Sequence, residues 1–564
     1  MLGLTRDVVA DEDRWQQRAD RATWLRLHRL QDGGAPLGDA AAERLAQLEA
    51  PYPQWRRRDD DGDDFPFLRL DPSELHQTLP TPYRRRELVE WLQEYPTPDV
   101  WNEDEWRVRC RHSFPAAACA LFALARQDIW VPDRWAEALS AWREAHQLRR
   151  SWRLLSGSLL EMPDQAFRVI LREVSIWQAS AAEAGVQASH NFIALADRII
   201  ELAKADESSG EHEGDEVGDP YIAAINHPVG HVTEALLAAW RQEGASDNQG
   251  LSEPYRTRFT ALLEGQSVCD RSASVVLARA ASVLYRVDPH WAEQALLPRF
   301  DWTTNPASAA EAWQGLLSAG RLDLNLASAL ERPFLETAIH NTALGVFGDN
   351  YAAILASAGL AQDGRFTADD LRKALEALGA EGLAQVAKAL SRALEAADDT
   401  RRTDEESRTG DKRGTGDTRR TGDKWTAGDK RRTYYANRIV PFFADVWPRT
   451  YAASSPAVAE ALGELCIAAD EDFPAAVELV RHWLMPVDFP YGLIHRLRES
   501  GLCERHPSAA LRFLRMVVGD NCRLLGRELR ACLDEICEAE PALVQDEGVE
   551  RLGRLALSLP ALRY

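Results

Sequence analysis

The apolar residues of this chain recur at helical spacing along most of its length, whereas the period-two alternation of a half-buried strand is hard to find. In residues 132–146, one helical face carries Trp135, Ala138, Leu139 and Trp142. Two leucine stripes on either side of the Gly379–Gly382 break predict a pair of helices, and Thr367 is placed to cap the first of them. The spacing therefore predicts an all-α fold.

Prolines that are suited to the first turn of a helix recur at a regular interval near the C-terminus. Pro441, Pro474, Pro507 and Pro541 are separated by 33, 33 and 34 residues. Each interval has room for two helices of roughly 10 to 14 residues. This period predicts an elongated α-solenoid of helical hairpins, of the HEAT or TPR kind, although no tetratricopeptide or ankyrin consensus is present. Chance spacing of helix-start prolines is the alternative.

Two polar segments interrupt the helical pattern and set the expected domain organisation. Residues 205–219 are acidic and predict an exposed loop. Residues 401–433 contain four near-copies of a six-residue unit, such as TGDKRG, and predict a low-complexity, disordered insertion. We therefore expect an N-terminal helical region, central helical repeats and C-terminal helical repeats, at residues 1–204, 220–400 and 434–564.

The charge balance bears on the class of partner. Lys and Arg total 66 and Asp and Glu total 88, which gives a net charge of −22 and argues against a protein that binds nucleic acid over its whole surface. The 401–433 segment has 11 basic and 7 acidic residues and is locally basic. Its candidate residues for binding nucleic acid or an acidic partner are Arg419, Arg420, Trp425, Arg431 and Arg432. A loop expansion without function is the alternative.

One local constellation could hold a metal ion. His227, His231 and Glu234 have the spacing H-x3-H-x2-E, which can place ligands on one helical face. Pro228 pushes His227 out of helical geometry, so a tight turn that leads into a buried helix is the alternative. The sequence has no phosphate-binding loop and no signature of a hydrolase, metalloprotease or kinase. We predict no catalytic residue and no cofactor.

Cysteine usage and hydropathy bear on the compartment. The eight cysteines form no C-x-x-C pair and predict reduced, packed thiols. The N-terminus lacks a signal-peptide core, and the longest apolar run, 114–125, is too short to span a bilayer. We therefore expect a cytoplasmic protein with no membrane partner.

Tryptophan is unusually frequent, with 18 residues against 4 methionines. Its helical spacing beside Leu and Ala predicts that it fills the space between helices. The alternative is a surface on which nucleic-acid bases stack, and only Trp152, beside Arg149, Arg150 and Arg153, resembles one.

Several segments together resemble the long α-helical C-terminal region of large bacterial defence-associated proteins. They are YYANRIVPFFADVWPRT, FPAAVELVRHWLMP and HRLRESGLCERHPSAALRFL within 434–514, with FDWTTNPASAAEAWQGLL, NHPVGHVTEALL and PQWRRRDDDGDDF nearer the N-terminus. In some of these proteins the region follows a sirtuin-like, NAD-handling domain. This chain has no matching glycine-rich segment, so the resemblance implies a helical piece whose enzymatic part is absent or lies on another chain.

These observations favour a non-enzymatic helical-repeat scaffold or recognition module in a bacterial antiphage system. Its expected partner is a protein, such as an enzymatic subunit or a phage component. The first alternative is a hydrolase or nuclease whose catalytic residues are scattered along the sequence. The second is a nucleic-acid sensor that uses residues 401–433 and 149–153.

Overall fold

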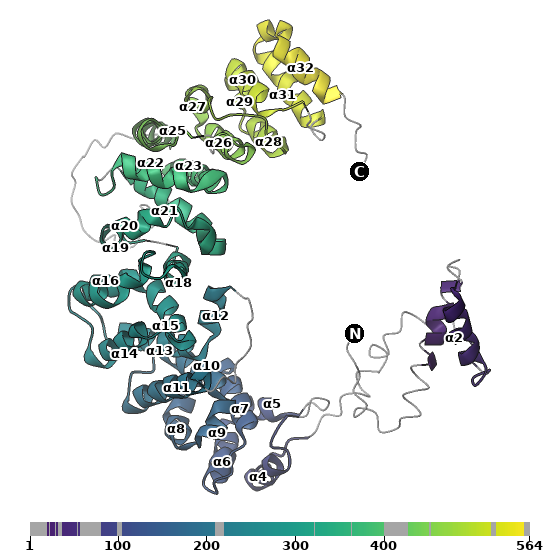
Figure 1. Cartoon of the computed structure of the whole chain (residues 1–564), viewed down its shortest axis with the longest axis vertical. Coiled ribbons are helices and arrows are strands. Elements are labelled where there is room, and N and C mark those ends of the chain that lie inside the picture. The colour runs from purple at the N-terminus through teal and green to yellow at the C-terminus, as the bar shows by residue number, and fades with distance from the viewer. Residues whose placement is uncertain are drawn as a thin grey trace, which may run out of the picture. The chain divides into compact units, whose positions relative to one another are not determined.

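A computed structural model describes most of the chain (Figure 1). The described residues are 20–21, 23–28, 30–31, 37–53, 55–56, 80–98, 104–208, 219–320, 322–361, 364–399, 427–450, 453–520 and 526–557. Within them every regular element is a helix, and no strand is present. The predicted all-α class is therefore confirmed.

The chain divides into two compact units, Met1–His146 and Gln147–Tyr564, and the division lies inside the predicted N-terminal region. The helices of the first unit are α2 (Asp39–Glu49), α4 (Arg85–Glu94), α5 (Trp106–His112), α6 (Phe114–Ala125) and α7 (Pro132–Glu144). Helix α4 packs on α6, and α5 packs on both α6 and α7. Around α2, a separate small core contains Trp24, Leu25, Leu45, Leu48 and Trp55.

The second unit contains a long series of short helices. Before residue 400 they are α8 (Leu148–Glu161), α9 (Asp164–Val169), α10 (Leu171–Glu183), α11 (His190–Ser208), α12 (Pro220–Asn226), α13 (Pro228–Gln242), α14 (Glu253–Glu264), α15 (Val268–Arg279), α16 (Ala281–Val287), α17 (Pro289–Trp291), α18 (Pro306–Ser318), α19 (Leu324–Ala329), α20 (Glu331–Glu336), α21 (Gly348–Ala361), α22 (Ala368–Ala377) and α23 (Gly379–Asp399). After it they are α25 (Ala427–Tyr434), α26 (Pro456–Ala468), α27 (Phe473–Val480), α28 (Tyr491–Glu499), α29 (Leu502–Arg505), α30 (Pro507–Val517), α31 (Gly526–Ala539) and α32 (Glu547–Leu557).

Shorter elements join or continue these helices. The π-helical turns are η2 (Ala292–Leu296), η5 (Tyr435–Ile439) and η6 (Phe442–Val446). The 3-10 turns are η3 (Leu297–Phe300), η4 (Asn341–Phe347), η8 (Asp470–Asp472) and η9 (Pro541–Gln545). The predicted pair of helices with a break at Gly379 is present, because Gly379 has a φ of 72° between α22 and α23, and the Thr367 side chain caps α22 by accepting a hydrogen bond from the Asp370 backbone N–H.

Helices that are not adjacent in sequence pack in a regular order in the second unit. One series of contacts runs α10–α13–α15–α18–α21–α23–α26–α28–α31. Helices on the other side of the hairpins also meet their neighbours, as in the contacts α8–α11, α27–α30 and α30–α32. Most of these helices therefore pack on helices from both earlier and later parts of the chain.

Several polar contacts between helices join residues 32 to 37 positions apart, whereas others have different separations, such as 26 for Trp177 to Ser151 and 45 for Arg279 to Glu234. The first group includes Trp142 to Cys110 (32 residues), Asn191 to Ser156 (35), Trp302 to Thr337 (35), Asn350 to Leu317 (33), Arg498 to Glu535 (37) and Arg551 to Val518 (33). Still longer separations appear where a pair lies on either side of residues 209–218 or 400–426. Arg258 and Asp197 are 61 residues apart, and Arg438 and Leu360 are 78 apart.

The prolines fall where the helices begin, with one exception. Pro474, Pro507 and Pro541 lie in the first turns of α27, α30 and η9. Pro441 was expected to begin a helix, but it lies inside continuous helical backbone between η5 and η6. Proline has no N–H group and collides with the carbonyl four residues earlier, so α-helical hydrogen bonding fails there and π-turns take its place.

The tryptophans pack between helices as predicted. Trp106, Trp135, Trp142, Trp177, Trp313 and Trp447 are among the largest fully buried side chains. Trp152 is 6% exposed and stacks on Trp177 with ring centroids 4.7 Å apart. The alternative of a base-stacking surface at Trp152 is therefore wrong, because its ring is covered by its own core.

The two polar segments lie largely outside the described residues, which exclude 209–218 and 400–426. At the end of the predicted 401–433 insertion the structure differs from the expectation of disorder. Residues 427–433 belong to α25, which packs on α23 and η8. These tertiary contacts stabilise a helix that its polar composition alone does not predict.

One stretch of described residues, Asn341–Ala361, has the length and composition of a membrane span. This stretch differs from residues 114–125, which are the longest apolar run in the sequence. Its backbone is kinked at Gly345, and Tyr351, Leu355 and Leu360 are buried in the second unit. These contacts are those of a core helix, which passes the same criterion as a span.

A buried arginine organises the first unit. The Arg134 side chain is 1% exposed and pairs with Asp104 at 2.7 Å and Glu137 at 2.8 Å. It also donates hydrogen bonds to the carbonyl oxygens of Tyr95 (2.9 Å) and Thr97 (3.0 Å). One guanidinium therefore ties α7 to the segments that follow α4 and precede α5.

Replacing Arg134 with alanine should strongly destabilise the first unit. The change leaves the Asp104 carboxylate, which is 5% exposed, without its cation. Removing one partner of a buried pair costs about 3–5 kcal/mol. Thermal unfolding of R134A and of the control R107A measures the effect. Arg107 pairs with Glu144 on the surface, so R107A should cost at most about 1 kcal/mol, and equal losses in the two variants would contradict the assignment.

A carboxylate from one hairpin caps a helix of another. Glu207 of α11 accepts hydrogen bonds from the backbone N–H groups of Val268 (2.6 Å) and Cys269 (3.3 Å), in the first turn of α15. Partial burial raises the pKa of Glu207, but these hydrogen bonds outweigh it and hold the pKa below its ordinary value of 4.5.

We expect Glu207→Ala to lower the free energy of unfolding by about 0.5–2 kcal/mol at neutral pH. A pKa that folding lowers gives stability that is present above the unfolded pKa and is lost as the pH falls through the folded value. The difference from wild type should therefore shrink as the pH drops below 4.5. Unfolding curves at several pH values measure it, with the exposed Glu201→Ala as control. A difference that persists at low pH would exclude the carboxylate cap.

Candidate interaction surface

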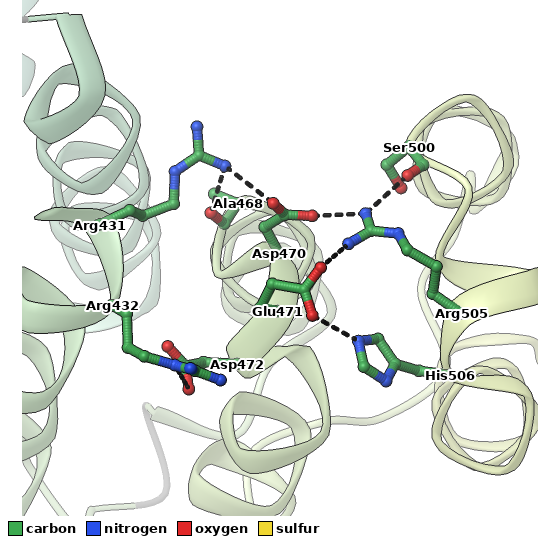
Figure 2. A network of polar contacts seen from close by, with 9 residues as sticks. All are labelled: Arg431, Arg432, Ala468, Asp470, Glu471, Asp472, Ser500, Arg505 and His506. Atoms are coloured by element: carbon green, nitrogen blue, oxygen red, sulfur yellow. Dashed lines mark hydrogen bonds and ion pairs between the residues drawn. The ribbon is translucent and has the colours of Figure 1, made fainter. Parts of the chain in front are cut away.

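Two of the candidate partner-binding residues lie in a network of charges on the C-terminal hairpins (Figure 2). Arg431 of α25 lies 3.9 Å from an Asp470 carboxylate oxygen and donates to the Ala468 carbonyl oxygen at 3.4 Å. Arg432 lies 3.5 Å from Asp472. Both arginines therefore pair with carboxylates of the chain itself, and an acidic ligand would have to compete with those pairs.

The opposite side of this acidic turn meets the next hairpin. Arg505 of α29 binds Asp470 and Glu471, the latter at 2.6 Å, and donates to the Ser500 carbonyl oxygen at 2.9 Å. Hydrogen bonding to Asp470 raises the pKa of Arg505. His506 approaches Glu471 at 3.9 Å. Figure 2 shows Asp470 between Arg431 and Arg505, so one turn joins the hairpin before it to the hairpin after it.

The remaining candidates in the insertion, Arg419, Arg420 and Trp425, lie outside the described residues. Partner binding by these three residues stays a prediction. The network around Asp470 could not be read from the sequence, because its members come from positions between 431 and 506.

The structure places the three candidate metal ligands near the start of α13. His227 has extended backbone angles between α12 and α13, and its ring Nδ1 accepts a hydrogen bond from the Val229 backbone N–H at 3.2 Å. Glu234 pairs with Arg279 at 3.2 Å, and burial raises the pKa of its carboxyl. No group of three His, Cys, Asp or Glu side chains in the described ranges, His231 included, is placed to hold a metal ion. The geometry agrees with the turn interpretation.

Another surface on α28 carries exposed aromatic side chains beside carboxylates. Phe489 and Tyr491 are 76% and 50% exposed. Tyr491 stacks on His495 with parallel rings 5.9 Å apart, and His495 lies 3.2 Å from Glu499. Tyr491, His495 and Glu499 are four residues apart and share one helical face. We refer to Phe489 and these three residues as the α28 face.

The α28 face is anchored to its neighbouring helices by ion pairs. Arg496 binds Glu395 of α23 at 3.0 Å and Glu464 of α26 at 3.3 Å. Arg498 binds Glu528 and Glu535 of α31 at 3.1 and 2.7 Å. The sequence contains the signal for this face, since an F-P-Y segment precedes His and Glu at four-residue steps, but sequence analysis did not single it out.

Among the described residues, the thiols are poorly suited to nucleophilic catalysis. Burial raises the pKa of Cys269 to about 12 and raises the pKa of Cys466 further. Hydrogen bonding to Cys532, together with burial, raises the pKa of Cys503. A thiol must ionise to attack a substrate, and these raised pKa values keep the three thiols protonated at neutral pH.

A pocket of about 120 Å³ between α21, α22 and η6 is lined mainly by apolar side chains such as Phe366, Leu371 and Phe442.

A double-mutant cycle tests the link made by Asp470. The variants D470A, R505A and the double mutant should give a coupling energy of about 0.5–1 kcal/mol at low salt, because the pair is partly exposed. The coupling should fall as the salt concentration rises from about 0.05 to about 0.5 M. Thermal unfolding measures it, with the more exposed Glu550–Arg554 pair as control. Equal coupling in the two pairs would contradict a special role for Asp470.

Comparison with known proteins gives limited information. No protein-family model matches the chain. A segment of 120 residues is 32% identical to the uncharacterized protein y4cA of Sinorhizobium fredii. The segment is 21% of this chain and 10% of that protein, which is therefore about twice as long. The likeness concerns a segment and covers a small share of both proteins.

Proposed function

We propose that this chain is a non-enzymatic scaffold, an elongated α-solenoid of helical hairpins that holds a protein partner. One observation supports the solenoid above the others. Contacts between helices recur at separations of 31 to 40 residues, as in Trp291 to Thr260 and Arg168 to Asp206, and not only where the prolines are regular. A stack of hairpins, each packed on its neighbours, produces this separation.

We propose the α28 face as the part of the surface that contacts the partner. Large exposed aromatic residues are the usual anchors of protein interfaces. Carboxylates outnumber arginines around α28, so the local charge is negative. Arg496 and Arg498 pair with Glu395, Glu464, Glu528 and Glu535, and Glu499 lies beside His495. Exposed aromatic rings and carboxylates both attract cationic side chains. The expected partner therefore presents a segment that contains Lys or Arg.

The biological setting of the proposal comes from the resemblance to defence-associated proteins. It suggests a cytoplasmic antiphage system in which the partner is an enzymatic subunit or a phage component. The α28 face lies within residues 434–514, the stretch of the sequence that carries this resemblance.

The double variant F489A/Y491A should lose the partner without unfolding. Both side chains are exposed, so their removal should change the midpoint of thermal unfolding little. Loss of two aromatic anchors should weaken binding by at least about tenfold. Affinity purification of tagged wild type and variant from the native host, followed by quantitative mass spectrometry, measures the loss.

The control is V169A/V544A, which removes two exposed aliphatic side chains from other parts of the second unit. It should retain the partner at wild-type level. Equal recovery with F489A/Y491A would reject the α28 face as the contact surface. Catalytic turnover by the purified chain alone would reject the scaffold itself.

A further inference from the structure

The start of α4 in the first unit carries an aromatic ring and three arginines on the surface. Tyr83 is 77% exposed, and the side chains of Arg84 and Arg86 are 85% and 93% exposed. Arg84 and Arg86 make only long, exposed ion pairs, with Glu87 at 3.6 Å and Glu90 at 3.4 Å. Such pairs contribute little and exchange readily with other anions.

A buried guanidinium lies against one face of this exposed ring. Cζ of Arg109 is 3.3 Å from the centroid of the Tyr83 ring, and Arg109 is only 6% exposed. Arg109 donates one hydrogen bond, to the Thr81 carbonyl oxygen at 3.2 Å. Arg109 therefore holds one face of the Tyr83 ring in place. Because Tyr83 is 77% exposed, the opposite face of its ring is open to solvent.

The charge of Arg109 is not balanced by a carboxylate among the described residues, in contrast to Arg134. Its Nε and the nearby Oγ1 of Thr81, which is 2% exposed, have no hydrogen-bond partner. Burying a charge without a carboxylate partner costs free energy, and an anion bound beside the Tyr83 ring would offset part of that cost through its attraction to the Arg109 charge. Two independent features, an open aromatic face and an unbalanced buried cation, thus meet at one place.

We propose that Tyr83, Arg84, Arg85, Arg86 and Arg109 form a site for a nucleotide unit, which is either a free nucleotide or part of a single-stranded nucleic acid. The base stacks on the open face of Tyr83, and the phosphate lies among the arginines. A base provides a π-face for any aromatic platform, and arginine is the preferred partner of phosphate. The electron-withdrawing cation beneath Tyr83 favours an electron-rich base above it. This function is separate from the scaffold and uses another unit of the chain.

Global charge does not exclude such a site. The net charge of −22 is a property of the whole chain, whereas an anion within a Debye length of about 8–10 Å responds to the local arginines. An acidic peptide would also satisfy the arginines. It would gain nothing from an open ring that is braced by a guanidinium, so the ring favours a nucleotide.

Fluorescence anisotropy with the full chain tests the site. The probe is a labelled single-stranded DNA of about 12 nucleotides, and ATP is the competitor. Y83A should weaken binding of the strand roughly tenfold through lost stacking, and Y83F should bind as wild type does. R84A/R85A/R86A should weaken binding and flatten its salt dependence. The matched controls Y285A and R481A/R512A/R530A change other parts of the surface and should bind as wild type does.

The competition identifies the source of the nucleotide unit. If ATP displaces the strand at concentrations comparable to the strand, the site takes free nucleotides. If only unlabelled strand displaces the probe, the site belongs to a nucleic-acid surface. Binding that is absent, that survives Y83A, or that polyglutamate displaces as well as DNA does would overturn the proposal. Circular dichroism of each variant checks folding. If Y83A is unstable, the triple variant R84A/R85A/R86A, which changes only exposed side chains, still tests the site.

Discussion

The helices of the second unit are short and pack on helices that come before and after them in the chain, as α15 packs on α13 and α18. A single pair of short helices cannot bury enough apolar surface to offset the entropy lost on ordering. The contacts that solve this problem join residues little more than one hairpin apart, as Trp302 and Thr337 or Asn350 and Leu317 do. The constraint is local in space and in sequence. Extra segments such as 209–218 and 400–426 therefore lengthen the separation of particular pairs without altering the pattern on either side.

The need to bridge hairpins explains the side chains that the sequence favours. Tryptophan fills the gap between two helices, and several of the buried indoles also donate a hydrogen bond to another helix. Trp106 donates to the Arg134 carbonyl oxygen at 3.0 Å, and Trp177 donates to Ser151 Oγ at 3.0 Å. Methionine fills space as well, but it is flexible and has no donor. A fold that depends on fixed contacts between helices gains more from tryptophan than from methionine, which agrees with the 18 tryptophans and 4 methionines of the sequence.

The sequence allowed the prediction of features that depend on residues close together in the chain, but not of features that depend on residues far apart in it. The helices, the cap at Thr367 and the starts at Pro474 and Pro507 depend on neighbours within a few residues, and the sequence displays those directly. The helix that contains Arg431 depends on packing against distant helices. The same limit applies to the sites. The His227 turn was predictable because Pro228 acts locally, whereas the braced ring of Tyr83 requires Arg109, which is 26 residues away in the sequence.

The number of basic residues in this chain does not indicate whether it binds nucleic acid. Many arginines bind the free carbonyl oxygens at the C-terminus of a helix in a neighbouring hairpin, where a cation also meets the negative end of the helix dipole. Arg198 does this for α8, Arg149 for α10, Arg438 for α21 and Arg431 for α26. These four arginines are thereby committed to the fold, although Arg149 and Arg431 belong to the basic segments that the sequence assigned to nucleic acid. An arginine indicates a ligand only where neither a helix end nor a carboxylate takes up its charge. Within the part of the chain that the structure describes, this criterion separates Arg109 from Arg134, although both are buried in the same unit.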